Sequence, residues 1–151
     1  RDAYAKFIKN LKDLGVAFVC VNFVKYEFIR SNTIDVVRQK EAYFKEIVDN
    51  ILPYDPTIDE LIIPTIEDYK ENMQGLPLTD LIIAAYLKKY KGLYLLTNDH
   101  GDFPTKIFNR KHIFNIEEFG NRIYGIYTYK PMLDTIEAVV TPSISDDDIP
   151  F

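Results

Sequence analysis

The chain has few residues that could cross-link it or bind a soft metal. Its 151 residues include one cysteine, Cys20, two histidines and no tryptophan. A single cysteine excludes an internal disulfide, and the apolar residues around it at positions 16–21 indicate a small buried hydrophobic side chain. We therefore expect a reducing, cytoplasmic setting.

Long apolar runs are also missing. No run approaches the roughly 18 residues of a membrane-spanning helix, and residues 1–6 lack the apolar core of a signal peptide. We therefore expect no membrane partner. The chain is nevertheless 47% apolar, and a chain of this length can bury about two-thirds of its unfolded surface. One core without disulfides is sufficient.

A basic excess is the third absence. The formal net charge is −5, which argues against a nucleic-acid partner because phosphate binding usually needs a basic surface. The distribution weakens this objection: residues 1–50 carry nine Lys/Arg against seven Asp/Glu, and residues 51–151 carry nine against sixteen. Since divalent cations could neutralise some of the later carboxylates, net charge does not exclude RNA.

Apolar periodicity predicts helices that alternate with short strands. We expect helices over residues 4–14, 23–30, 33–51, 65–73 and 79–91, and strands over residues 16–21, 61–64, 93–96 and 112–116. Strands separated by helices favour right-handed crossovers and a mostly parallel sheet with helices on both faces. The expected fold class is therefore α/β.

Three carboxylates lie where predicted helices begin or predicted strands end. Asp80 opens an apolar helix on the face that it shares with Ala84 and Leu87, Asp99 follows a strand, and Glu27 lies in the helix after another strand. Burying an ionised carboxylate is costly unless a cation or a hydrogen-bond network compensates it. Ligands converge at the carboxyl ends of parallel strands. Oxygen ligands without Cys or His favour Mg²⁺ or Mn²⁺ over zinc.

Each of these residues also has an ordinary alternative. Glu27 could pair with a nearby cation on its helix, and Asp80 could serve only the positive end of the helix dipole. Asp99 and Asp102 could simply form a turn. His100 lies between them, but a lone histidine in a turn is more often incidental, so we leave it out of the predicted catalytic set.

Three blocks of sequence share their order and spacing with a known family. They are residues 21–30 (VNFVKYEFIR), 78–85 (LTDLIIAA) and 95–99 (LLTND) with 101–103 (GDF). Together they resemble the PIN domain, particularly its VapC-like branch, over roughly residues 3–118. The resemblance implies a three-layer α/β/α sandwich with a mostly parallel sheet in residues 1–120. Residues 121–151 would then be a C-terminal extension and acidic tail.

The same resemblance implies a metal-dependent endoribonuclease that hydrolyses RNA, with a VapC-like toxin as the commonest context. Glu27, Asp80 and Asp99 would take the places of the catalytic metal-binding acids, with Asp102 as an auxiliary ligand of Mg²⁺ or Mn²⁺. RNA is the implied substrate. An antitoxin protein and a second copy of the chain are candidate partners.

The chain departs from the family at its start. The family opens with an apolar strand that ends in an aspartate, its first acidic ligand, whereas Asp2 here begins a helix. We expect that the chain begins downstream of that strand, which would leave the metal site incomplete. Two alternatives follow: a catalytically inactive PIN-like module that binds RNA or protein, and a different α/β Mg²⁺ protein such as a phosphohydrolase or receiver-like domain.

Basic residues of the first half are candidates for steering RNA. They are Lys6, Lys9, Lys25 and Arg30. Their ordinary alternative is the solvated face of an amphipathic helix.

Overall fold

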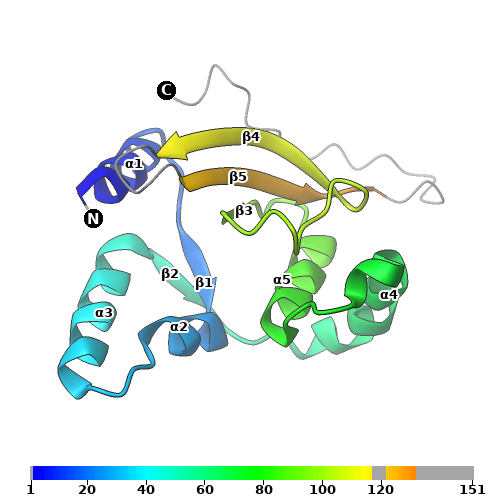
Figure 1. Cartoon of the computed structure of the whole chain (residues 1–151), viewed down its shortest axis with the longest axis horizontal. Helices are drawn as coiled ribbons and strands as arrows, with labels where there is room; N and C mark the ends of the chain where they lie inside the picture. The colour runs from blue at the N-terminus through cyan, green and yellow to red at the C-terminus, as the bar shows by residue number, and fades with distance from the viewer. Residues whose placement is uncertain (1, 117–121, 132–151) are drawn as a thin grey trace. The chain divides into compact units, whose positions relative to one another are not determined.

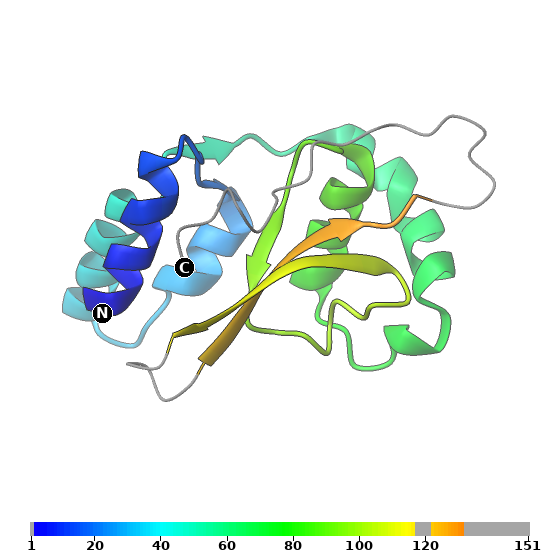
Figure 2. The same ribbon diagram turned by 90° about the horizontal axis from the view of Figure 1, so that it is seen from above.

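The computed structural model describes residues 2–116 and 122–131, which form two compact units (Figures 1 and 2). The first unit extends to Asp55 and the second begins at Pro56. Each unit mixes helices with a small sheet, which confirms a mixed α/β fold class. None of the helices in the described ranges is both long and apolar enough to cross a membrane.

The first unit combines helices with a parallel pair of strands. Its elements are α1 (Asp2–Asp13), β1 (Val19–Val21), α2 (Asn22–Ile29), α3 (Ile34–Ile47) and β2 (Asn50–Leu52). The helix predicted over residues 4–14 is confirmed in α1, where Phe7, Ile8 and Leu11 are buried on one face, but Leu14 lies beyond its end and is exposed. β1 and β2 pair in parallel, with Cys20 opposite Ile51.

The helix α3 ends earlier than the sequence predicts. We expected a helix over residues 33–51, but α3 ends at Ile47 and Ile51 lies in β2. Ile51 continues the helical spacing of the buried Phe44, yet pairing with β1 satisfies the backbone of an extended segment there. A tertiary contact outweighs the local pattern at this position.

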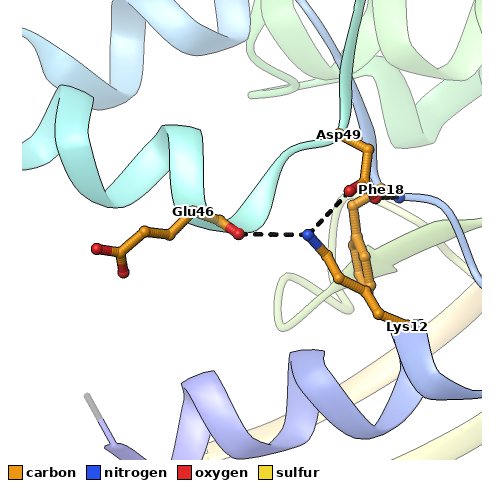
Figure 3. Close-up of polar contacts among 4 residues, drawn as sticks. All are labelled: Lys12, Phe18, Glu46 and Asp49. Carbon is orange, nitrogen blue, oxygen red and sulfur yellow. Dashed lines mark hydrogen bonds and ion pairs between the residues drawn. The ribbon is translucent and has the colours of Figure 1, made fainter.

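Asp49 connects the end of α3 to the segment before β1 (Figure 3). Its carboxylate accepts the backbone N–H of Phe18 at 2.8 Å and Lys12 Nζ at 3.0 Å. Lys12 Nζ also donates to the carbonyl oxygen of Glu46 at 3.3 Å. The Phe18 N–H and the Lys12 ammonium both lower the pKa of Asp49, because they stabilise its ionised form. The ionised carboxylate therefore stabilises this unit.

The second unit begins with helices and ends with a sheet. Its elements are η1 (Pro56–Ile58), α4 (Asp59–Tyr69), η2 (Lys70–Met73), α5 (Leu78–Lys89), β3 (Leu95–Thr97), β4 (Phe108–Ile116) and β5 (Arg122–Tyr129). The strand predicted over residues 61–64 is wrong, because these residues lie in α4. Ile58, Thr65 and Tyr69 are fully buried and recur at helical spacing. The helix predicted over residues 65–73 therefore begins too late, because the apolar run at residues 61–63 followed by Pro64 is typical of the end of a strand.

The strands β3, β5 and β4 form an antiparallel sheet with β5 in the middle. Only five residues separate β4 from β5, a connection long enough for an antiparallel hairpin, whereas a parallel crossover needs about a dozen or more. Among the described strands, parallel pairing is confined to β1 and β2. The mixed α/β class stands, but a mostly parallel three-layer sandwich is not confirmed.

Aromatic side chains fill the core of the second unit, where α5 packs against the antiparallel sheet and against α4 (Figures 1 and 2). The buried cluster consists of Tyr69, Ala84, Leu87, Phe103, Ile107, Phe108, Tyr127 and Tyr129. Residues 122–129, predicted to begin a C-terminal extension, form the central strand of this sheet. The predicted acidic tail at residues 145–148 lies outside the described residues.

Candidate metal centre

Asp80 lies in the first turn of α5, on a rigid element. The chain enters this helix through Pro77, whose backbone is extended (φ −60°, ψ 147°) and whose carbonyl oxygen accepts the N–H of Asp80 at 3.1 Å. A carboxylate at this end of a helix is favoured by the backbone dipole. Asp80 is half-buried, and Ala84 and Leu87, four and seven residues later, are buried in the core. The predicted orientation of the helix is thus confirmed.

The loop after β3 carries the other two carboxylates. We call residues 99–102 the acidic loop. Its backbone is shaped by local hydrogen bonds: the N–H of Asp99 donates to Thr97 Oγ1 at 3.0 Å, and the N–H of Asp102 donates to Asp99 Oδ1 at 3.3 Å. These are the side-chain-to-backbone contacts by which Thr and Asp stabilise turns. Thr97 therefore orients the loop.

The three carboxylates Asp80, Asp99 and Asp102 meet. One ligand oxygen from each lies within 4.8 Å of the others, and the group could hold a metal ion. Asp80 and Asp102 are half-buried, while Asp99 is exposed. Asp99 and Asp102 lie 19 and 22 positions after Asp80 in the sequence, with the rest of α5 and β3 in between. Folding therefore brings these carboxylates together.

The protonation behaviour of the acidic loop reflects this crowding. Partial burial, followed by a hydrogen bond with Asp80 and the negative charge of that residue, raises the pKa of Asp102. Partial burial and a hydrogen bond with Asp102 raise the pKa of Asp99. Carboxyl groups this close resist simultaneous ionisation. A divalent cation would relieve their repulsion, so the donor set fits such an ion.

Glu27, the remaining predicted ligand, is an exposed residue of α2 in the first unit. Its place in a metal centre stays a prediction. Two of the predicted RNA-steering lysines have carboxylate partners, since Lys9 pairs with Asp13 at 2.7 Å and Lys25 pairs with Glu41 at 3.4 Å. Lys6 and Arg30 stay candidates on exposed positions.

Sequence reasoning missed the side-chain contacts that hold the acidic loop, which involve Tyr69, Tyr127 and the loop's own His100. The hydroxyl of Tyr69 donates to the carbonyl oxygen of Asp102 at 2.8 Å. His100, set aside as incidental, bonds through Nδ1 to the Tyr127 hydroxyl and through Nε2 to the carbonyl oxygen of Ile123 at 2.8 Å. The one local signal is the group of tyrosines at positions 124, 127 and 129.

The three carboxylates can bind a hard cation, and because Asp99 is exposed, the cation would be accessible from solvent. Oxygen donors from a helix start and a turn are the ligands that Mg²⁺ and Mn²⁺ prefer. Comparisons of the chain with protein-family models, curated proteins and solved structures found no match.

Proposed function

We propose that the chain is a divalent-metal-dependent endoribonuclease of the PIN-like type, with Asp80, Asp99 and Asp102 as the ligands of Mg²⁺ or Mn²⁺. The observation that carries the proposal is the convergence of these carboxylates within 4.8 Å. Two further features support it: the order of the sequence blocks around the acids, and the absence of Cys or His from this donor set.

The role of the chain's own carboxylates would be to bind the metal ion and to hold it in a defined orientation. Asp80 lies in the first turn of α5, so the helix fixes the position of its backbone. Asp99 and Asp102 stand on a hydrogen-bonded turn, which limits the orientations of their carboxylates. A bound Mg²⁺ or Mn²⁺ would supply Lewis acidity toward water and a phosphodiester. No side-chain nucleophile is required, and Glu27 is proposed as a further acid of the same chemistry.

Cleavage of a labelled RNA tests the proposal. The full chain is incubated with an RNA of mixed sequence that carries different dyes at its two ends, in Mg²⁺, in Mn²⁺ and in EDTA. We expect internal cuts that depend on metal and that fall at least about a hundredfold in Asp80→Asn and Asp99→Asn. Glu67→Gln is the matched control, because Glu67 is an exposed acid of α4 in the same unit.

Two results would contradict the proposal. Cleavage that persists in EDTA or in both Asn variants would remove these carboxylates from the chemistry. RNA binding without any cleavage in Mn²⁺ would favour the inactive PIN-like module instead.

A further inference from the structure

The acidic loop is held from two sides by buried tyrosines. We infer that Tyr69 and Tyr127 are positioning residues, which bring Asp99 and Asp102 to Asp80 without touching a metal themselves. The inference rests on the proposed metal site. Both tyrosines are fully buried, and they come from different elements, α4 and β5.

Tyr127 acts through His100. The hydroxyl of Tyr127 contacts Nδ1 of His100, and Nε2 of the same ring contacts the carbonyl oxygen of Ile123 at 2.8 Å. A carbonyl oxygen can only accept, so Nε2 carries the hydrogen; in the neutral ring Nδ1 then accepts from the tyrosine hydroxyl. One imidazole thereby attaches the acidic loop to β5 at two points.

Gly125 makes room for this contact. Residues two apart in a strand point to the same face, so Gly125 and Tyr127 are neighbours on β5. A Cβ at position 125 would lie 2.7 Å from Cε2 of Tyr127 and 3.1 Å from its hydroxyl oxygen. The ring thus lies back over the glycine along the strand, in the direction of Ile123. The missing side chain is what lets the hydroxyl reach His100.

Tyr69 holds the other end of the loop. Its hydroxyl donates to the carbonyl oxygen of Asp102 at 2.8 Å. The next residue, Phe103, is only 2% exposed, and its ring centre lies 5.3 Å from that of Phe108 and 6.3 Å from that of Tyr127. The loop therefore ends in the core.

The buried hydroxyls need these partners. A buried Tyr hydroxyl without a hydrogen bond is costly, so each tyrosine favours the loop conformation that supplies its acceptor. The acceptors are a ring nitrogen and a main-chain oxygen, not the carboxylate atoms of the metal group. The tyrosines would therefore affect metal binding by orienting the loop that carries the ligands, as do other residues that hold metal ligands in place without contacting the metal.

Hydroxyl deletions with two readouts test the inference. The full chain and its variants Tyr69→Phe, Tyr127→Phe and Tyr129→Phe are compared. Tyr129 is the matched control, since it lies on the same strand and is buried, but its hydroxyl donates to Asp68 at 2.6 Å. The readouts are hydrogen exchange of the peptide over residues 98–103 without metal, and Mn²⁺ affinity by electron paramagnetic resonance.

We expect the two loop-facing deletions to speed exchange over residues 98–103 and to weaken Mn²⁺ binding about tenfold or more. Tyr129→Phe should lower stability but leave both loop readouts unchanged. His100→Ala serves as a second loop variant should a core tyrosine variant fail to fold, because His100 is only half-buried.

The outcomes separate the inference from the proposed function. If the unmodified chain binds no Mn²⁺, the metal site is wrong, and the exchange data still decide whether the tyrosines hold the loop. If it binds Mn²⁺ but Tyr69→Phe, Tyr127→Phe and His100→Ala match Tyr129→Phe in both readouts, the positioning role is overturned and the metal site stands.

Discussion

Replacing Gly125 by alanine tests the packing of β5, because the sign of the change in unfolding free energy shows whether a side chain fits there. At a strand position with open space, Gly→Ala usually stabilises a protein by about 0.4–1 kcal/mol, because it restricts the unfolded chain. At Gly125 the new Cβ would lie 2.7 Å from Cε2 of Tyr127. Ordinary carbon contacts are about 3.5–4.0 Å, so something must move by about 1 Å.

The ring of Tyr127 cannot yield cheaply. It is fully buried, and its centre lies 6.3 Å from that of Phe103 and 5.9 Å from that of His100. Overpacking of this kind costs about 1–3 kcal/mol. Set against the gain in the unfolded state, a net loss of about 1–2 kcal/mol is expected for Gly125→Ala, which corresponds to a fall in Tm of about 2–8 °C for a chain of this size.

Urea unfolding followed by circular dichroism measures this loss. Gly92→Ala is the control, because a Cβ there meets nothing within 4 Å and its backbone is outside the left-handed region. We expect Gly92→Ala to be neutral or stabilising by up to about 1 kcal/mol. Equal stabilisation by Gly125→Ala and Gly92→Ala would refute the close approach of Tyr127 to position 125.

Four other substitutions test local energetics by denaturant or thermal unfolding. Asp49→Asn should destabilise the chain at pH 7. Because the folded state lowers the pKa of Asp49 from 3.8, the ionised carboxylate contributes its full stabilisation above pH 3.8 and loses it as the pH falls through the lowered pKa. A stability difference between the two proteins that stays constant down to pH 2 would contradict this. Lys88→Met should cost about 3 kcal/mol, because it leaves the nearly buried Asp68 with the Tyr129 hydroxyl but without the ammonium group 2.6 Å away. Lys9→Met, at an exposed pair, should cost less than about 1 kcal/mol. Equal losses in the two variants would refute the contrast. Lys70→Gly should stabilise by about 1 kcal/mol, since Lys70 has φ 52°, and a loss of stability there would count against backbone strain.

Local patterns predicted the helices whose buried residues are apolar and recur at helical spacing. The stripe of Phe7, Ile8 and Leu11 identified α1, and the apolar run around Ala84 identified α5. Prediction failed at the start of α4, where the apolar run at residues 61–63 followed by Pro64 is typical of a strand end but lies in the helix. It also failed where strand pairing decides, as for the end of α3 and for the antiparallel partners of β5.

The acidic residues of the candidate site could be predicted from the sequence, but the tyrosines that hold the acidic loop could not. Asp80, Asp99 and Asp102 stand next to recognisable helix and strand ends, so the sequence could single them out. The predicted basis of their convergence, neighbouring carboxyl ends of parallel strands, does not hold, because β3 lies in an antiparallel sheet. The hydroxyl contacts of Tyr69 and Tyr127 join residues 33 and 27 positions apart. No periodicity encodes such contacts, because they depend on how α4 and β5 pack around the same loop.

A calorimetric titration with Mn²⁺ tests the central claim most directly. It compares the unmodified chain with Asp80→Asn and with Glu67→Gln, an exposed acid outside the metal group. The convergence of Asp80, Asp99 and Asp102 predicts saturable binding that Glu67→Gln retains and that Asp80→Asn weakens at least about tenfold. No saturable binding to the unmodified chain, or equal affinity in Asp80→Asn, would contradict it.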